Sequence, residues 1–159
     1  MGDDGQIVRV PAMVAAMRHV QTGEIVGIHR TVIALNGSAK IARRGLGSLR
    51  HAAIMLDRAG DDPAELTVAE GIETGIAARM LGFKRVWALY STSNVRSLPV
   101  LPAVRRLTLL EENDANGASA KACAVCAERW DSAGVEVSIV RPRAGLSDLN
   151  DVILKERAQ

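Results

Sequence analysis

The fold class is best indicated by residues 66–73, which read Leu66-Thr67-Val68-Ala69-Glu70-Gly71-Ile72-Glu73. Four strand-forming residues are followed by an acid, and the glycine after it opens a helical stretch. The same order returns further on, where the apolar run 107–110 precedes the acidic group 111–114. A third acidic group, 148–151, follows the apolar run 137–140 after a short loop. Each acidic group therefore lies where a strand is expected to end.

Strand and helix patterns alternate from residue 66 onward. Gly82 and Gly134 stop the two clearest helices, and Pro99 limits any regular element near 94–98 to a weak helix or loop. This order predicts an α/β fold with a parallel four-stranded sheet flanked by helices and right-handed crossovers. The expected strands are 66–69, 86–90, 106–110 and 137–140, and the expected helices are 72–81, 118–133 and a short one from Asp148.

The residues before this alternating region predict a small β-rich subdomain. A hairpin is expected from strands 13–20 and 24–33, and a short strand at 53–56. The polar, Gly- and Pro-containing segment 58–63 has no periodicity and is the best boundary in the chain. We therefore expect an N-terminal subdomain over 1–63 and the alternating domain over 64–159.

Acids at three strand ends predict a common site. In an open parallel sheet, ligands bind beyond the carboxyl ends of the strands, so these side chains should converge on one small volume. Like charges this close repel one another unless a cation neutralises them or one of them takes up a proton. Mg²⁺ prefers such oxygen ligands and completes its shell with water and substrate phosphates. We therefore expect metal-assisted phosphoryl transfer.

The composition predicts a compact cytoplasmic domain. The chain has 159 residues, of which 48% are hydrophobic, and a formal net charge of +2. That charge is too small to indicate a nucleic-acid binder by itself. No apolar run approaches the roughly 20 residues that span a bilayer, and the N-terminus lacks the basic and apolar regions of a signal peptide. We expect no membrane partner.

Two cysteines, Cys123 and Cys126, lie three residues apart in the Ala-rich helical stretch. Such a pair can serve as half of a zinc site or as a redox pair. However, no second Cys or His pair stands nearby, and a redox pair is expected at a strand-to-helix turn. We expect two small helix residues in a reducing compartment.

Together, the segments 68–74, 112–117 and 145–151 resemble the three motifs of the Toprim domain. This fold is shared by bacterial primases, type IA and type II topoisomerases, OLD-type nucleases and RecR-like repair proteins. The likeness is strongest to primase-like Toprim proteins of phages, plasmids and other mobile elements. Their Gly-Ile-His-Arg-Thr and Ala-Glu-Gly-Ile-Glu-Thr segments have counterparts at 27–31 and 69–74. The resemblance covers nearly the whole chain.

The resemblance implies a role for each matching acid. Glu70 matches the glutamate that the family uses as a general acid or base, or as part of the metal site. Glu112 and Asp114 match the Asp-x-Asp pair that binds Mg²⁺, a place that Mn²⁺ can also take. Asp148 and Asp151 match the acids that follow the last strand and complete the metal site.

The first acid of the Asp-x-Asp pair is a glutamate here, one methylene longer. Mg²⁺ demands near-ideal octahedral geometry, so this departure bears on catalytic competence more than on the fold. If the geometry is compromised, Glu112→Asp should raise activity, and if the chain has packed around the longer acid, activity should fall. Glu111 is a poor substitute for Glu112, because consecutive residues of a strand point to opposite faces.

The densest basic stretch before the Toprim core is 40–51. It is either a solvated loop or, as the likeness to primases implies, a nucleic-acid contact in which Arg43, Arg44 and Arg50 bind phosphates. Its glycines would let the backbone approach the ligand closely. Arg30, in the predicted hairpin, is expected on the same surface, and His29 is expected to be structural.

The implied function is Mg²⁺-dependent nucleotidyl transfer on nucleic acid by an enzyme that resembles the catalytic core of a DNA primase. The implied partners are single-stranded DNA and nucleoside triphosphates, with a helicase or zinc-ribbon module supplied in trans or missing from this chain. Two alternatives stay open: a Mg²⁺-dependent nuclease, in which the same acids activate water, and a non-catalytic binding module of the RecR-like kind.

Overall fold

One continuous eight-stranded sheet organises the computed structural model, which describes residues 9–37 and 39–157. The strand order is β3-β2-β1-β4-β6-β5-β7-β8. The strands are β1 (Ala12–His19), β2 (Ile25–Ile33), β3 (Lys40–Gly47), β4 (Ala52–Met55), β5 (Glu65–Ala69), β6 (Val86–Ala88), β7 (Arg106–Leu110) and β8 (Glu136–Val140).

The last four strands form the predicted parallel sheet. β5 pairs in parallel with β6 and β7, and β7 pairs in parallel with β8. The sheet does not stop there, however, since β4 adds to β6 and β1 adds to β4, both antiparallel. The prediction of four parallel strands is therefore confirmed for the core, but the whole sheet has eight strands.

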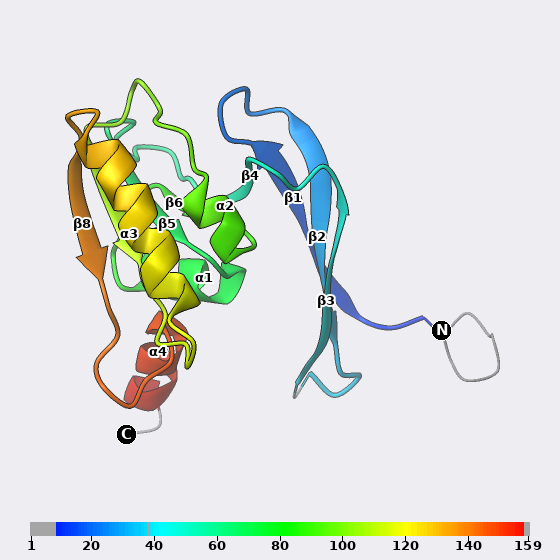
Figure 1. Ribbon diagram of the computed structural model, residues 1–159. Helices are drawn as coiled ribbons and strands as arrows, with labels where there is room; N and C mark the ends of the chain where they lie inside the picture. The colour runs from blue at the N-terminus through cyan, green and yellow to red at the C-terminus, as the bar shows by residue number, and fades with distance from the viewer. Residues whose placement is uncertain (1–8, 38, 158–159) are drawn as a thin grey trace.

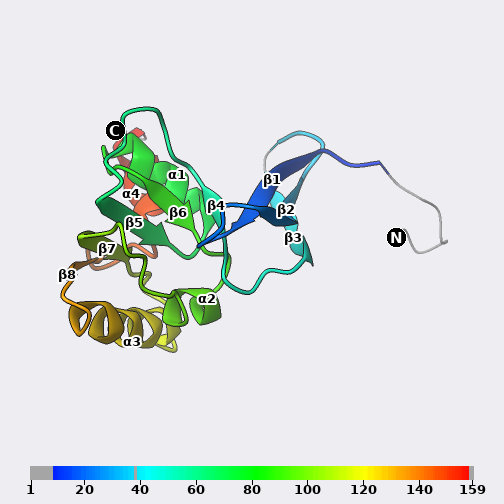
Figure 2. The same ribbon diagram turned by 90° about the horizontal axis from the view of Figure 1, so that it is seen from above.

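Helices cover both faces of the parallel part of the sheet. α1 (Ile72–Met80) and α4 (Leu149–Arg157) lie on one face, and α2 (Thr92–Arg96) and α3 (Ala118–Asp131) lie on the other (Figure 2). The expected helices are confirmed, including the weak one before Pro99. No helix in the described ranges is long and apolar enough to cross a membrane.

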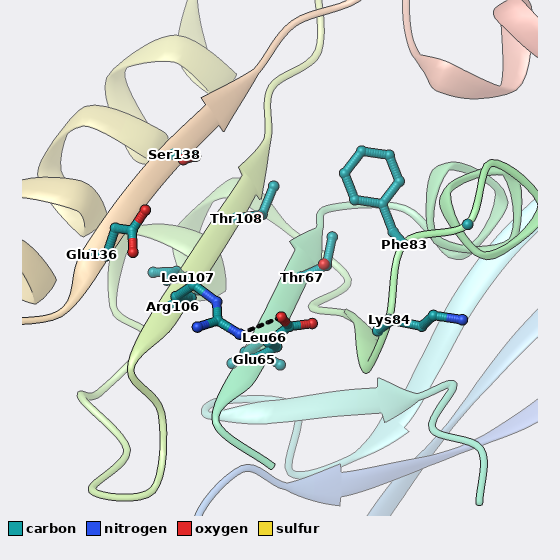
Figure 3. Close-up of a pocket in the computed structure, with 11 residues that line it drawn as sticks. Glu65, Leu66, Thr67, Phe83, Lys84, Arg106, Leu107, Thr108, Glu136 and Ser138 are labelled. Carbon is teal, nitrogen blue, oxygen red and sulfur yellow. Dashed lines mark hydrogen bonds and ion pairs between the residues drawn. The ribbon is translucent and has the colours of Figure 1, made fainter. Parts of the chain in front are cut away.

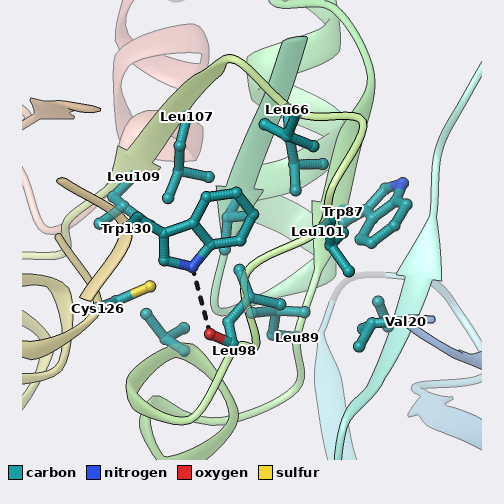
Figure 4. Close-up of a cluster of buried hydrophobic side chains, with 14 of the residues drawn as sticks. Val20, Leu66, Trp87, Leu89, Leu98, Leu101, Leu107, Leu109, Cys126 and Trp130 are labelled. Atoms are coloured by element: carbon teal, nitrogen blue, oxygen red, sulfur yellow. Dashed lines mark hydrogen bonds between the residues drawn. The ribbon is translucent and has the colours of Figure 1, made fainter. Parts of the chain in front are cut away.

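The larger core lies between the sheet and the α2–α3 layer (Figure 4). Trp130 of α3 is fully buried there, and its indole Nε1 donates a hydrogen bond to the Leu98 carbonyl at 3.2 Å. Cys123 and Cys126 pack in the same cluster as free, buried thiols. Burial raises the pKa of Cys123 to about 11 and that of Cys126 to about 12, so both stay neutral. Both cysteines lie on α3, as expected, and the structure adds that they are buried.

The strands β1, β2 and β3 form an antiparallel sheet that projects to one side of the α/β core (Figure 1). The segment 40–47 was predicted as an irregular basic stretch, and it is in fact strand β3. The strand holds three basic residues and only two large apolar ones, Ile41 and Leu46, so it shows no alternating hydrophobic pattern. Its inner face packs on the loop before β4. A Cβ at Gly45 would lie 2.2 Å from a methyl group of Leu49.

A third apolar cluster joins the hairpin to the parallel sheet. Met17 of β1 is fully buried against Ile54 of β4, Ala88 of β6 and Ile72 of α1. β4 thus belongs by its hydrogen bonds to the sheet of the C-terminal part, although it precedes the segment 58–63. The close approach at Gly45 likewise serves packing within the protein.

Candidate functional site

Residues from the three acidic groups meet in one small hollow at the carboxyl ends of the parallel strands. Its volume is about 160 Å³. Glu70 follows β5, Glu112 follows β7 and Asp148 precedes α4. Lys40 and Arg43 of β3 line the same hollow. The full lining is Lys40, Arg43, Glu70, Gly71, Glu73, Thr74, Glu112, Asp148 and Asn150. The convergence predicted from the strand ends is present, and we call this hollow the acidic pocket.

Glu70 leaves the sheet between the buried strand β5 and Gly71, the residue that caps the start of α1. Burial raises the pKa of the Glu70 carboxyl above its ordinary value, and the negative charges of Glu112 and Asp114 add to this rise. The nearby positive charge of Arg43 opposes it. The raised pKa makes the Glu70 carboxylate a stronger base than a solvated glutamate.

Glu112 is held from two sides. Its Oε1 accepts a hydrogen bond of 3.0 Å from the Thr74 hydroxyl of α1, and its backbone N–H donates to the Ser119 hydroxyl at 2.9 Å. Burial raises the pKa of Glu112, which the Thr74 hydrogen bond lowers and the charge of Asp148 raises further. Glu111 points to the other face, where its buried carboxylate pairs with Arg141 at 2.8 Å. The strand-alternation argument that separated Glu111 from Glu112 is confirmed.

The loop before α4 is tied to the loop after β7. The Asn113 backbone N–H donates to the Ser147 carbonyl at 2.7 Å, and its Nδ2 donates to the Leu146 carbonyl at 2.7 Å. These bonds place Asp148 beside Glu112, although 35 residues separate them in sequence. The Asp148 Oδ1 also accepts from the Asp151 backbone N–H at 3.0 Å and so caps α4.

The two remaining predicted acids lie outside the lining of the acidic pocket. Asp114 accepts hydrogen bonds from the backbone N–H groups of Ala118 at 2.8 Å and Ser119 at 3.3 Å, at the start of α3. Its charge still acts on Glu70. Asp151 accepts from the Ser147 backbone N–H at 2.8 Å, within its own turn. Asp114 thus caps α3 and Asp151 fastens the loop before α4, and the charge of Asp114 also acts on the site.

Two cations of β3 reach the acidic pocket. Lys40 pairs with Glu73 at 2.8 Å. Burial raises the pKa of Glu73, but the Lys40 hydrogen bond and charge outweigh it, and the net pKa is lowered. The Arg43 guanidinium lies over the ring of Tyr90, with 5.2 Å from its Cζ to the ring centroid. The hairpin therefore supplies positive charge where the C-terminal part supplies negative charge.

The other predicted basic residues lie elsewhere. Arg30 and Arg44 are register partners in β2 and β3, so they share the face opposite to Arg43. With Arg9 they line a separate hollow of about 620 Å³ on the outer side of the hairpin sheet. Arg50 is exposed in the turn before β4. The expected single basic surface is thus divided between two faces.

His29 is structural in its contacts, as expected. It is 2% exposed, and its Nε2 lies 2.8 Å from the Thr31 hydroxyl. Desolvation by burial lowers its pKa, and the charges of Arg43 and Lys40 lower it further against the opposing effect of Glu73.

A larger hollow of about 230 Å³ lies at the amino ends of β5, β7 and β8, away from the acidic groups (Figure 3). Arg106 crosses it and pairs with Glu65, which raises the pKa of this guanidinium. No acid of the three groups lines this hollow.

Sequence reasoning missed three residues of the site. Thr74 belongs to the first motif and was assigned no role. Lys40 lies in the basic stretch but was not singled out. Tyr90 lies two residues after the buried strand β6, and its polar ring near a strand end was the available signal.

The carboxylate oxygens of the acidic pocket match the ligands that Mg²⁺ prefers. In the described ranges, no three His, Cys, Asp or Glu side chains are already grouped as a metal site. The donors present are nevertheless of the right kind, because Glu112 and Asp148 line the same hollow and the charge of Asp148 raises the pKa of Glu112.

DNA primases are among the solved structures that share this fold. A DNA primase domain from Pseudomonas aeruginosa aligns with a TM-score of 0.62 and 17% identity, covering 98% of this chain and 51% of that one. The primase fragment of the bacteriophage T7 primase-helicase protein gives 0.57 and 20%, covering 94% and 60%. A DnaG primase catalytic domain bound to ssDNA gives 0.61 and 15%, covering 91% and 48%. The chain thus spans about half to three fifths of these structures.

Family comparisons divide the chain into two matched segments. Residues 1–56 match a domain of unknown function (DUF7146), and residues 65–159 match the Toprim domain. No curated protein sequence matches the chain. Since the second match covers more than half of the residues and holds all three acidic groups, the chain belongs to the Toprim domain family.

Proposed function

We propose that this chain performs divalent-metal-dependent nucleotidyl transfer on nucleic acid, as the catalytic core of a primase-like protein. The observation that carries the proposal is the acidic pocket, where Glu70, Glu112 and Asp148 face the cations Lys40 and Arg43 across one hollow. A site for phosphoryl transfer needs acids for metal and proton, and cations for phosphate, within reach of one another. The fold shared with solved primases supports the same reading.

We assign the ion to Mg²⁺, with Mn²⁺ as a substitute. Glu112 and Asp148 would hold it, and Asp114, which already acts on the same pocket electrostatically, would contribute the third carboxylate. When bound, the ion would neutralise these charges and the charge that develops on the transferred phosphate. Asp151 would support the turn that carries Asp148.

Glu70 would take the proton in this chemistry. A 3′-hydroxyl oxygen attacks the α-phosphorus of a nucleoside triphosphate, the new P–O bond forms, and the bond to the pyrophosphate leaving group breaks. The hydroxyl proton passes to the Glu70 carboxylate, whose pKa is raised by burial and by its acidic neighbours. Arg43 and Lys40 would bind the phosphate oxygens on the hairpin side of the pocket.

The partners follow from this chemistry. Single-stranded DNA would serve as template and nucleoside triphosphates as substrates, with Arg43 on the backbone beside the pocket. Arg44, Arg30 and Arg50 would act only if the strand also follows the outer face or the turn of the hairpin. A helicase module would come from elsewhere in a larger protein or assembly, as the name of the T7 primase-helicase protein indicates, and a zinc-ribbon module would be supplied in the same way.

The test is a template-directed extension assay with the full chain. Use of a short primer annealed to a single-stranded template removes the need for an initiation module. With Mg²⁺ or Mn²⁺ and a labelled nucleoside triphosphate, the wild type should lengthen the primer, and Glu70→Gln should not.

A parallel reaction contains end-labelled DNA and metal but no nucleotide. Cleavage in this reaction, without extension in the first, would replace the proposal by the nuclease alternative. Metal and DNA binding without either product would favour a non-catalytic module.

A further inference from the structure

The single tyrosine of the chain, Tyr90, links the hairpin to the acidic pocket. It follows β6, which is buried throughout, and its backbone turns sharply there, with φ at +73°. This left-handed region is uncommon for a residue with a side chain. The turn is held by a hydrogen bond of 2.8 Å from the Tyr90 backbone N–H to the carbonyl of Glu70 itself. The backbone of Tyr90 is therefore hydrogen-bonded to the backbone of a residue that lines the acidic pocket.

The ring is held from the hairpin side by His29. The two rings meet edge to face, with centroids 5.5 Å apart and planes at 75°. His29 is buried and contacts Thr31 within the same strand, so it offers the tyrosine a fixed surface. Edge-to-face pairs of this kind favour one ring orientation.

The second partner of this ring is the Arg43 guanidinium, whose Cζ lies over the ring, 5.2 Å from the centroid. Within residues 9–37 and 39–157, no carboxylate oxygen comes within 4.0 Å of Arg43 in an ion pair. Arg43 nevertheless lines the acidic pocket, and its charge acts on both Glu70 and Glu112. An exposed arginine without an ion pair has many rotamers, and a cation–π contact reduces that freedom.

We propose that Tyr90 is a positioning residue that holds the Arg43 guanidinium at the acidic pocket, ready for an incoming phosphate. The ordering of Arg43 stands on the geometry alone. Its use by a phosphate rests on the proposed function.

Two opposite effects follow from an ordered cation beside the carboxylates. Arg43 repels a divalent cation that enters alone, and it attracts a triphosphate that enters with the metal. Loss of the ring should therefore tighten binding of Mn²⁺ alone and weaken binding of inorganic triphosphate in the presence of Mn²⁺. A loss of fold or packing would weaken both.

The first measurement needs neither metal nor phosphate. In NMR spectra of the metal-free full chain, the Arg43 δ protons should be shifted upfield by the Tyr90 ring, and the Arg43 Nε–H should show restricted fast motion. Tyr90→Phe should keep both signatures, and Tyr90→Leu should lose both while the remaining amide spectrum stays dispersed. A mobile, unshifted Arg43 in the wild type would overturn the proposal even if Tyr90→Leu fails to fold.

The second measurement is calorimetric titration with Mn²⁺ alone and with inorganic triphosphate plus Mn²⁺. We expect Tyr90→Leu to shift the two affinities about 2- to 5-fold in opposite directions, and Arg43→Gln to shift them further. The double variant should match Arg43→Gln, because the ring acts only through the guanidinium. Additive losses, or equal losses of both ligands, would contradict positioning. If Arg43 is ordered by Tyr90 and neither ligand binds the wild type, the positioning holds and the proposed function fails.

Discussion

The surroundings of Glu70 raise the proton affinity of its carboxylate above that of a solvated glutamate. Burial and the charges of Glu112 and Asp114 raise its pKa, and Arg43 moderates the rise. A base in this position takes up a proton more readily than a solvated glutamate. Because the charges of Glu112 and Asp114 act on Glu70, a cation bound beside these acids would also change the proton affinity of Glu70.

We expect Glu70→Gln to leave the fold intact and to lower nucleotidyl transfer about 10²-fold or more, since the amide cannot accept the proton. In the wild type, activity should rise with pH through a value above the ordinary glutamate pKa, because the base must first lose its own proton. Primer-extension rates from pH 5 to 9 measure both effects, with circular dichroism as the control for folding. An unchanged rate in the variant would assign the proton to another group.

Glu112→Gln should stabilise the metal-free protein at neutral pH. Because burial and then Asp148 raise the folded-state pKa of Glu112 against the effect of Thr74, its protonated form favours folding. That stability is present below the ordinary carboxyl pKa and is lost as pH rises through the raised value. The variant removes this loss, so Tm should rise at pH 7 and stay unchanged near pH 3.

Thermal melts in the presence of a chelator measure the Tm of Glu112→Gln and of the wild type. We expect the variant's Tm to be about 1–3 °C higher at pH 7, for a domain of this size. The matched control is Glu128→Gln, an exposed position on α3, which should have no such pH-dependent effect. A lower Tm at pH 7 would show that Glu112 is favoured in its charged form.

Glu112→Asp restores the family's Asp-x-Asp pattern, and we expect it to lower activity. The longer side chain reaches the Thr74 hydroxyl at 3.0 Å, and an aspartate is one methylene too short for this hydrogen bond. The structure thus favours the second of the two outcomes foreseen for this position. Primer extension with Mg²⁺ and Mn²⁺ checks it, and Thr74→Val should cause a smaller loss in the same direction. A gain in activity would mean that the Thr74 contact is incidental.

Strand β3 distributes its charges by simple alternation. Arg43 points toward the acidic pocket, and its neighbour Arg44 points to the outer face beside Arg30. A strand presents successive side chains to opposite faces, so adjacent arginines serve different surfaces. This division gives a matched pair of substitutions within a single element.

We expect Arg43→Ala to weaken single-stranded DNA binding and to reduce the salt slope by about one unit, as for the loss of one phosphate contact. Arg44→Ala changes the net charge equally and should leave the slope unchanged, if the DNA lies in the groove beside the pocket. Fluorescence anisotropy at several salt concentrations gives the slopes. An effect of Arg44→Ala and Arg30→Ala alone would place the DNA on the outer face of the hairpin.

The whole molecule is organised by a sheet that crosses its two sequence segments. β4 pairs with β6, and the buried side chains of Met17 and Ile54 pack against Ile72 and Ala88. A shared sheet and a shared core predict that the hairpin and the α/β part unfold together. The acidic pocket depends on the contact between these two parts, because its cations come from β3 and its acids come from the α/β part.

Ile54→Ala should therefore destabilise the entire chain, by about 2–4 kcal/mol, since Ile54 is only 5% exposed. Tryptophan fluorescence reports on the α/β part, which holds both tryptophans, and hydrogen exchange of the β2 amides reports on the hairpin. Both should shift together. Ile25→Ala, at a position that is 59% exposed, is the control and should change little. Two separate transitions would show that the parts fold independently.

Much of the α/β part was predictable, because its signals are local. Apolar runs followed by acids indicated the strand ends of β5 and β7, and Gly82 and Gly134 indicated the ends of helices. Parallel order then required the acids of different strands to meet at one edge of the sheet. Residues such as Glu70, Glu112 and Asp148 could therefore be named as a common site.

The sequence by itself thus determined the parallel core and the meeting of the acids, since strand period and strand order are properties of short segments. Only the tertiary structure decided what faces those acids. Strand β3 has no hydrophobic period, so neither its existence nor the reach of Lys40 to Glu73 could be derived from its residues. The placement of Arg43 over Tyr90 likewise depends on the packing of two segments 47 residues apart and on one left-handed backbone turn. Contacts of this kind arise from the packing of remote segments, which no local pattern encodes.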